Sequence, residues 1–241
     1  MRLGYVGDGP LAAAAARRLA QLHEVVRAGA WNCDVVFTCG ASQEELLSST
    51  AKIVIDQTPR DPHQTRAIAD ELRRRGAVLL DAPIHCERID AMPEATAITC
   101  GGPAEVVATV RPLLECICPK VVYCGDTGSG QAARLVIGTV AACNRLVTYE
   151  CAAVGLKNGL ARENMAEVLN RSSGYNSALS VLESSGRTTD ITLGDMIEEL
   201  RMASRFAMHC GAPLLLANVG RGVFEAAAAR RGTAASLDEL A

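Results

Sequence analysis

The chain has 241 residues, 49% of them hydrophobic, and its formal net charge at pH 7 is -3. This length suits one large domain or two small ones, with enough apolar side chains for a buried core. The low net charge and the lack of a basic stripe give no indication of a nucleic-acid partner, and no apolar run nears the ~20 residues of a membrane span. Residues 1–6 lead directly into a predicted strand rather than a signal peptide, so we expect a cytoplasmic protein.

Strand and helix patterns alternate over the first half of the chain. Strands are predicted at residues 2–6, 23–27, 33–38, 52–56, 77–81, 95–99 and 121–123. Helices are predicted at residues 10–22, 43–48, 62–75 and 104–114. Strands separated by helices indicate an α/β fold with a Rossmann-like, doubly wound, mostly parallel sheet.

Only helical patterns follow in the second half of the chain. Helices are predicted at residues 131–158, 163–170, 177–184, 193–209 and 213–231, with glycines between several of them. We therefore predict a shortened dinucleotide-binding domain over residues 1–127 and an all-α domain over residues 128–241. The Gly-rich segment 125–130 joins them and feeds a long interdomain helix, whose first turn carries Arg134.

A glycine fingerprint follows the first predicted strand, in the sequence GDGPLA at residues 7–12. In the pattern GxGxxA, Gly7 would make the tight turn and Gly9 would let the backbone approach a pyrophosphate. Ala12 would let the helix pack closely on the strand. The N-terminus of that helix would offer N–H groups to phosphate. A tight turn without a ligand is the alternative.

Several residues in and near this loop differ from the usual dinucleotide-binding pattern. Asp8 places a carboxylate in the phosphate loop, and Pro10 removes one N–H group. An NAD site usually has Asp or Glu at the end of the second strand, but this strand ends in Arg27. Arg27 could pair with a 2′-phosphate, which favours NADP, or it could be a solvated arginine. About six residues then lead to the next strand, which is too short for a helical crossover, so we expect that a helix and an edge strand are missing.

Five motifs together point to one family. They are residues 4–9 (GYVGDG), 56–58 (DQT), 81–84 (DAPI), 101–102 (GG) and 128–134 (GSGQAAR). Taken together, they resemble the β-hydroxyacid dehydrogenase family, which includes 3-hydroxyisobutyrate dehydrogenase and relatives of 6-phosphogluconate dehydrogenase. The similarity runs nearly from end to end of the chain.

The resemblance implies a set of site residues. Those expected at the cofactor, from the resemblance and the loop, are Gly7, Asp8, Gly9, Pro10, Leu11, Arg27, Thr38, Cys39 and Thr58. Those expected at the substrate are Ile84, Cys86, Gly130 and Gly138. The family's catalytic lysine corresponds to Arg134, its asparagine to Gly138, and the Ser-Gly-Gly of its substrate motif to residues 85–87.

These departures change the expected chemistry. Arg134 can polarise an oxygen or clamp a carboxylate, but its high pKa makes it a poor proton donor. We expect His85 to handle protons, because imidazole titrates near neutral pH and because we place His85 at the end of a parallel strand. A structural, hydrogen-bonded histidine is the alternative. Cys86 is expected to be a packed thiol rather than a nucleophile.

The expected function is an NAD(P)-dependent oxidoreductase that acts on a small hydroxy acid, carbonyl or imine between the domains. Its expected partners are a small-molecule substrate and a second copy of the chain, bound through the helical domain. No metal site is expected, since the ten cysteines include no CxxC pair. The alternatives are a lyase, isomerase or hydrolase with an eroded cofactor site, or a non-catalytic binding protein.

Overall fold

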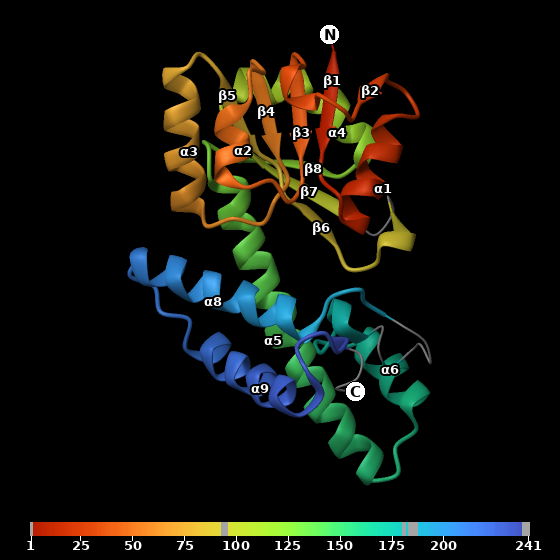
Figure 1. Cartoon of the computed structure of the whole chain (residues 1–241). Helices are drawn as coiled ribbons and strands as arrows, with labels where there is room; N and C mark the ends of the chain where they lie inside the picture. Colours follow the sequence, from red (N-terminus) through yellow and green to blue (C-terminus); the bar gives the residue numbers. More distant parts are fainter. Residues whose placement is uncertain (1, 93–95, 180–181, 183–187, 238–241) are drawn as a thin grey trace. The chain divides into compact units, whose positions relative to one another are not determined.

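The computed structural model describes residues 2–92, 96–179, 182 and 188–237. Contacts divide the chain into two compact units, Met1–Arg134 and Leu135–Ala241. One long helix, α5 (Ser129–Lys157), runs across the boundary between them (Figure 1).

The first unit is built on one sheet, in which the described residues form eight strands (Figure 1). They are β1 (Leu3–Val6), β2 (Val25–Val26), β3 (Val35–Thr38), β4 (Ile53–Asp56), β5 (Val78–Asp81), β6 (Ile84–Cys86), β7 (Thr96–Gly101) and β8 (Val121–Gly125). Their order is β2-β1-β3-β4-β5-β7-β6, with β8 also paired to β7. All pairs are parallel except β5 with β7 and β6 with β7. The mostly parallel, Rossmann-like sheet is therefore confirmed.

Helices cover both faces of this sheet, as the alternation of its side chains requires. The helices are α1 (Pro10–Leu19), α2 (Gln43–Ser48), α3 (Pro62–Arg74) and α4 (Ala104–Ile117). Tyr5 and Phe37 belong to the core with α1 and α4, whereas Val36 and Val54 belong to the core with α2 and α3. The sheet is thus doubly wound, with one apolar core on each face.

The connection from β2 to β3 is the shortened part of the fold. It contains only a 3-10 helix, η1 (Ala30–Asn32). The backbone of η1 lies directly against β1, because a Cβ added at Gly4 would be 2.5 Å from the carbonyl oxygen of Ala30. Glycine in this strand therefore permits a close backbone approach. The expected loss of a crossover helix and an edge strand is confirmed, since β2 is itself the edge strand.

The position of His85 differs from the prediction. The parallel strand β5 ends at Asp81, and His85 lies in β6, a strand that the sequence did not predict. In β6 it pairs antiparallel with β7, opposite Ala97. The expectation that His85 ends a parallel strand is therefore wrong. After Asp81 only Ala82 and Pro83 separate the two strands, so the turn is too short to show as a break in the apolar pattern.

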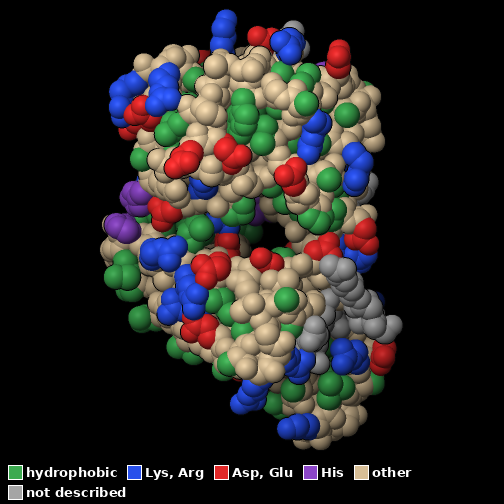
Figure 2. All heavy atoms as spheres, in the orientation of Figure 1, with side chains coloured by type: hydrophobic (Ala, Val, Ile, Leu, Met, Phe, Trp, Pro, Cys, Tyr) green, Lys and Arg blue, Asp and Glu red, His purple; other side chains and the backbone are tan. Residues whose placement is uncertain are grey.

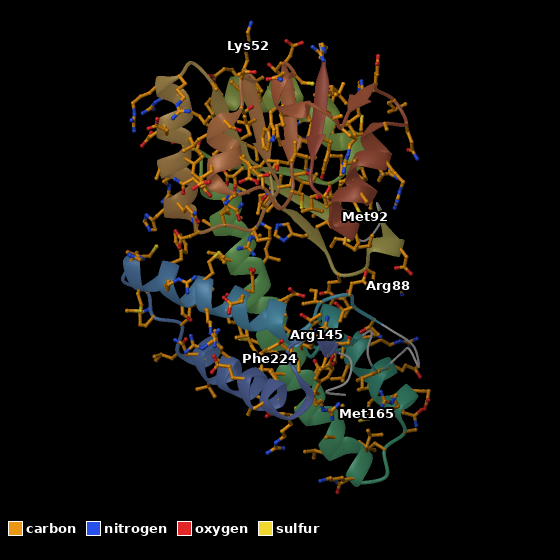
Figure 3. All side chains as sticks on the ribbon, in the orientation of Figure 1. Lys52, Arg88, Met92, Arg145, Met165 and Phe224 are labelled. Carbon is orange, nitrogen blue, oxygen red and sulfur yellow. The ribbon has the colours of Figure 1, made fainter. Side chains whose placement is uncertain are left out.

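The second unit is helical, as predicted. Its described elements are most of α5, then α6 (Arg162–Asn170), the 3-10 helix η3 (Ser177–Leu179), α8 (Leu193–His209) and α9 (Leu215–Arg231). Part of the helix predicted at residues 177–184 lies outside the described residues. The buried ring of Phe224 lies in the core that α8 and α9 share with α5 (Figure 3). Among the described residues, no helix is long and apolar enough to cross a membrane.

Charged side chains of both signs are mixed over the surface of the first unit. Figure 2 shows Lys and Arg interspersed with Asp and Glu on the visible face, without a continuous basic patch there. Interspersed charge of this kind is typical of a solvated surface.

Candidate functional site

The glycine loop between β1 and α1 has the geometry of an anion cradle. Gly7 has a φ of 141°, and a Cβ there would lie 2.2 Å from the carbonyl oxygen of Cys39 and 3.0 Å from the Cβ of Ala12. Gly9 has extended backbone and begins α1 without a side-chain cap, and a Cβ there would meet nothing within 4 Å. The first N–H groups of the helix, on Leu11 and Ala12, have no intrahelical acceptor and are available to an anion.

A cation lies beside this loop. The Nη2 group of Arg27, just after β2, donates a hydrogen bond to the carbonyl oxygen of Gly7 (2.6 Å). Its guanidinium also lies over the ring of Tyr5, 5.5 Å from the ring centre. Arg27 and Asp8 are both exposed, so neither side chain fills the space above Gly9. The structure thus brings Arg27 to the glycine loop, in a position from which it can reach an added phosphate.

The predicted cofactor residues at the ends of β3 and β4 lie near one another. Gly40 N donates to the hydroxyl oxygen of Thr58 (2.8 Å), which ties together the segments after the two strands. The hydroxyl of Thr38 and the amide nitrogen of Gln57 are buried and have no hydrogen-bond partner. A buried unpaired donor is costly unless a ligand or water satisfies it. These orphaned groups, with the open cradle at Gly9, fit a nucleotide diphosphate at this edge of the sheet.

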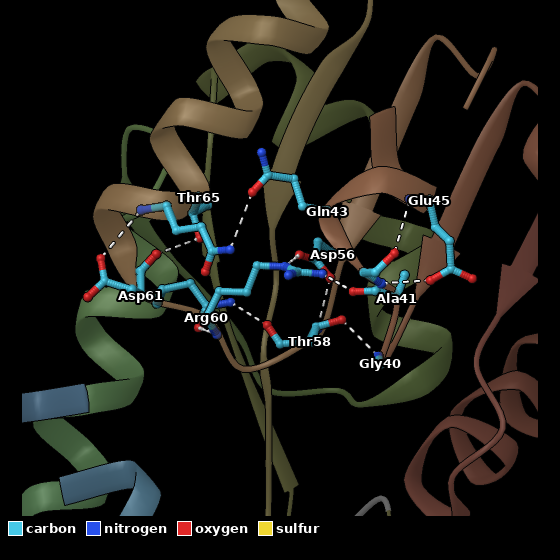
Figure 4. A network of polar contacts seen from close by, with 12 residues as sticks. Gly40, Ala41, Gln43, Glu45, Asp56, Thr58, Arg60, Asp61 and Thr65 are labelled. Atoms are coloured by element: carbon cyan, nitrogen blue, oxygen red, sulfur yellow. Dashed lines mark hydrogen bonds and ion pairs between the residues drawn. The ribbon is translucent and has the colours of Figure 1, made fainter. Parts of the chain in front are cut away.

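A buried ion pair fixes the same edge. Asp56 ends β4, and the Nε group of Arg60 donates to its carboxylate at 2.5 Å (Figure 4). Another guanidinium nitrogen of Arg60 donates to the carbonyl oxygen of Ala41, in the segment after β3. Burial raises the pKa of the Asp56 carboxyl above its ordinary value, and the charge of Arg60 offsets part of that rise. The pair joins the two segments in the absence of any ligand.

Asp81 anchors the start of α5 to the end of β5. Its carboxylate accepts hydrogen bonds from Gly128 N (2.7 Å) and Gln131 N (2.8 Å). Backbone donors at a helix start have no intrahelical acceptor, so this carboxylate serves as a cap from a distant strand. Burial raises the pKa of Asp81 to about 6, against the lowering effect of these two donors. A Cβ at Gly130 would lie 2.6 Å from Asp81 O and 2.8 Å from Thr99 O, so only glycine fits there.

Gln131 connects this anchor to Arg134. The side-chain oxygen of Gln131 accepts from Arg60 N (3.1 Å) and from the Nε group of Arg134 (3.0 Å). Its side-chain amide donates to the carbonyl oxygen of Thr58 (2.7 Å). Gln131 is fully buried and Arg134 is 6% exposed. The guanidinium of Arg134 is therefore oriented by a buried side chain three residues earlier on the same helix.

His85 is held by the strand beside it. Its Nε2 atom lies 2.9 Å from the hydroxyl oxygen of Thr99 on β7. Burial, helped by the positive charge of Arg134, lowers the pKa of His85 to about 4. The expectation that this imidazole titrates near neutral pH is therefore wrong, and His85 is neutral at pH 7.

The remaining predicted substrate residues have different surroundings. Ile84 is buried in the core of the first unit, since alternate residues of β6 point to opposite sides. Cys86 is half-buried, and its thiol donates to the carbonyl oxygen of Arg88 (3.1 Å). Gly138 belongs to the second unit, where a Cβ would lie 2.6 Å from a carboxylate oxygen of Glu199. Glu199 on α8 thus occupies the space in which a longer side chain at position 138 would lie.

Thr99, Gln131 and Arg60 also belong to this edge and were not predicted from the sequence. A signal existed for two of them, because Arg60 follows Asp56 by four residues and Gln131 precedes Arg134 by three on one helix face. Thr99 gave no signal, since its contact with His85 depends on the unpredicted strand β6.

The first unit is a doubly wound sheet whose first loop is an open glycine cradle, and a continuous helix joins it to a helical unit. This architecture is that of the dinucleotide-fold oxidoreductase class. Family models agree. Residues 10–125 match the NAD binding domain of 6-phosphogluconate dehydrogenase, and residues 128–241 match the NAD-binding region of NADP-dependent 3-hydroxyisobutyrate dehydrogenase. The chain belongs to the β-hydroxyacid dehydrogenase family.

Individual proteins show the same relationship. NAD-dependent L-serine dehydrogenase of Pseudomonas aeruginosa is 32% identical over 180 residues, which cover 74% of this chain and 60% of that protein. Mitochondrial 3-hydroxyisobutyrate dehydrogenase of Mus musculus is 28% identical over 183 residues, 71% of this chain and 55% of its own length. The chain thus matches little more than half the length of that relative.

Solved structures share the fold across the whole chain. The 3-hydroxyisobutyrate dehydrogenase of Mycobacterium tuberculosis, solved with L-serine, superposes with a TM-score of 0.86 at 20% identity and covers 100% of this chain and 98% of its own. A reductive aminase of Aspergillus terreus, with NADPH, cyclohexanone and allyl amine, has a TM-score of 0.55 at 18% identity, with 99% and 97% covered.

Proposed function

We propose that the protein is an NAD(P)-dependent oxidoreductase that acts on a small hydroxy acid, or on a related carbonyl or imine. The observation that carries the proposal is the open cradle at Gly9, at the uncapped start of α1 and beside Arg27. Membership in the β-hydroxyacid dehydrogenase family and the relatives named above support the same chemistry.

We assign the cofactor to the first unit. The N–H groups of Leu11 and Ala12 would hold the diphosphate, and Arg27 would pair with a 2′-phosphate, which favours NADP over NAD. Thr38, Cys39 and the Thr58 segment would line the same edge. When bound, the nicotinamide ring supplies or accepts a hydride.

The residues of the chain would handle the charge and the proton. Arg134 carries a permanent positive charge, so it would bind a substrate carboxylate or polarise the reacting oxygen. His85 is neutral at pH 7 and so cannot act as a strong acid there. Its unprotonated ring nitrogen would accept a hydrogen bond from a substrate hydroxyl and, as a weak base, take its proton when the alcohol is oxidised.

A titration of NADPH and NADH, by calorimetry and thermal shift, tests the proposal. The matched variants are Gly9→Val, which fills the cradle without a backbone clash, and Ala20→Val, which places the same side chain at the exposed far end of α1. We expect wild type and Ala20→Val to bind NADPH and Gly9→Val to lose binding while its melting temperature falls by only a few degrees, the cost of valine at the N-cap. Equal binding by both variants, or none by wild type, would refute a nucleotide in this loop.

An activity assay tests the chemistry separately. L-serine and 3-hydroxyisobutyrate serve as probes with NADP+ or NAD+, and the reduced nicotinamide is followed by absorbance. We expect Arg134→Met to abolish turnover of either probe while NADPH binding persists. Turnover without any nucleotide that disappears in His85→Ala would instead support a lyase or isomerase.

We further propose that residues 1–127 bind the cofactor and that residues 128–241 provide substrate contacts and a homodimer interface. Exposed apolar side chains support the interface. Leu216, Val219 and Val223 lie on one face of α9, and Val140 and Val147 lie one heptad apart on α5. Analytical ultracentrifugation should show a dimer that Leu216→Glu converts to monomer, and a wild-type monomer would contradict it. A cytoplasmic location remains a prediction.

A further inference from the structure

A chain of two hydrogen bonds connects His85 to the start of α5. The hydroxyl of Thr99 lies 2.9 Å from the Nε2 atom of His85, and the same hydroxyl donates to the carbonyl oxygen of Gly130 at 2.9 Å. Thr99 is buried on β7, and Gly130 is packed against Asp81 O and Thr99 O, so the acceptor cannot move away. All these groups belong to the first unit.

This arrangement determines where the imidazole proton lies. A threonine hydroxyl has a single proton, and a carbonyl oxygen can only accept. Because the Thr99 proton is used in the bond to Gly130 O, the Thr99 oxygen can only accept from His85. The Nε2 atom of His85 must therefore carry a hydrogen. The ring is neutral at pH 7, so its Nδ1 atom has a lone pair.

We infer that Thr99 is a positioning residue that fixes His85 as the Nε2-protonated tautomer and so presents Nδ1 as a hydrogen-bond acceptor to the substrate. Among the described residues, Nδ1 of His85 has no hydrogen-bond partner. The functional part of this inference rests on the proposed function, but the tautomer itself does not depend on any ligand.

The inference narrows the substrate class. A fixed acceptor needs a ligand group that donates a hydrogen, and the nearby charge of Arg134 favours an anionic group on the same ligand. A hydroxy acid or an amino acid in its ammonium form has both groups. A simple ketone has no donor for Nδ1, so it leaves this acceptor without the hydrogen bond that a hydroxy acid or an amino acid would make.

Nitrogen NMR of the full chain with 15N-labelled histidine tests the tautomer directly. The four histidines are His23, His63, His85 and His209, and the spectrum of His85→Gln identifies the signals of His85. In the wild type we expect a protonated Nε2 and an unprotonated Nδ1, with an Nε2–H signal that exchanges slowly with water. In Thr99→Val we expect the Nε2–H signal to be lost and the two ring-nitrogen shifts to move toward each other.

Two variants separate a specific role from a structural one. Thr99→Ser keeps a hydroxyl and should restore the wild-type spectrum. Thr96→Val removes a buried hydroxyl from the same strand that has no hydrogen-bond partner, so it should leave His85 unchanged. A protonated Nδ1 in the wild type, or an unchanged His85 spectrum in Thr99→Val, would overturn the inference. The wild-type measurement alone decides the tautomer if Thr99→Val fails to fold.

The ligand step is tested with L-serine as the probe, in the presence of NADP+. We expect L-serine to shift the Nδ1 signal in the wild type and in Thr96→Val. In Thr99→Val the affinity for L-serine, measured from the same shift, should be at least about tenfold weaker, which corresponds to ~1.4 kcal/mol. If the tautomer is as inferred but no hydroxy or amino acid shifts the Nδ1 signal, the inferred substrate class is wrong. If NADP+ itself does not bind, the proposed function fails while the tautomer stands.

Discussion

Two regions at the same edge of the sheet differ in how much of their structure is fixed without a ligand. At the ends of β4 and β5, Asp56, Arg60, Asp81 and Gln131 are buried and hydrogen-bonded to backbone or to one another. At the end of β1, the glycine loop has an uncapped helix start, open space at Gly9 and only exposed charges beside it.

The first of these regions contributes to stability, and the second is available for binding. The first region connects two strand ends to the start of α5, and so it fixes Arg134 through Gln131 before any substrate arrives. The second region leaves helix N–H groups unsatisfied, so a ligand gains the hydrogen bonds that the protein itself does not use. Substitutions in the first region should therefore unfold the protein, whereas substitutions in the second should change affinity.

The largest effect is expected from the buried ion pair. Asp56→Ala leaves Arg60 charged, buried and unpaired, so the free energy of unfolding should fall by about 3–5 kcal/mol. Urea unfolding measures this change. The control is Asp70→Ala, which removes the exposed partner of Arg73 and should cost less than about 1 kcal/mol. Similar losses in the two variants would show that the Asp56 pair does not fix this edge.

Next in size is the pH dependence contributed by Asp81. Its pKa is about 6 in the folded chain and about 3.9 when unfolded, so the folded state holds the extra proton between these values. The contribution of Asp81 to stability is therefore fully present below about pH 4 and falls by about 3 kcal/mol as pH rises through 6. The difference in unfolding free energy between wild type and Asp81→Asn should change by about 2 kcal/mol between pH 4.5 and 7, in urea titrations. A constant difference would contradict the burial of this carboxylate.

In the open region, Arg27 should set the choice of nucleotide. Arg27→Gln removes a charge-assisted bond to a 2′-phosphate, so NADPH affinity should fall about tenfold while NADH affinity changes little. Calorimetry with both nucleotides measures the ratio, and Arg17→Gln, exposed on α1, is the control. An equal loss for NADH would place Arg27 at the diphosphate or would make it a structural cation.

The smallest effect is expected at Asp8. Its exposed carboxylate repels a diphosphate across solvent, so Asp8→Asn should raise the affinity for NADPH and NADH alike, by roughly two- to fourfold at low salt. Added salt should remove the gain because it screens the repulsion. Glu44→Gln on α2 is the control for net charge. No gain at low salt would show that Asp8 points away from the bound anion.

Local patterns account for much of what the sequence predicted. The helix at Leu193–His209 was predicted with both ends correct, because its apolar pattern and the glycine at 211 lie in the sequence itself. The glycine loop was predicted for the same reason. At the start of the helix, the structure adds a capping box of Thr192 and Asp195. The length of the connection after β2 showed that a crossover helix was missing.

Long-range pairing explains the misses. Strand β6 has three residues and is defined by its antiparallel partner β7, so no period in the sequence marks it. Without β6, the bond between His85 and Thr99 could not be predicted, nor could the burial that lowers the pKa of His85. The prediction assigned His85 its ordinary pKa because a sequence does not show how deeply a side chain is buried.

The central claim is that the glycine loop is an open cradle for the diphosphate of a nicotinamide nucleotide. Backbone amide NMR of the 15N-labelled protein during an NADPH titration tests it most directly. We predict saturable shifts that are largest at Gly9, Leu11 and Ala12, with smaller ones at Gly40 and Thr58. Saturation without movement of the Leu11 and Ala12 amides, or no saturation at all, would contradict it.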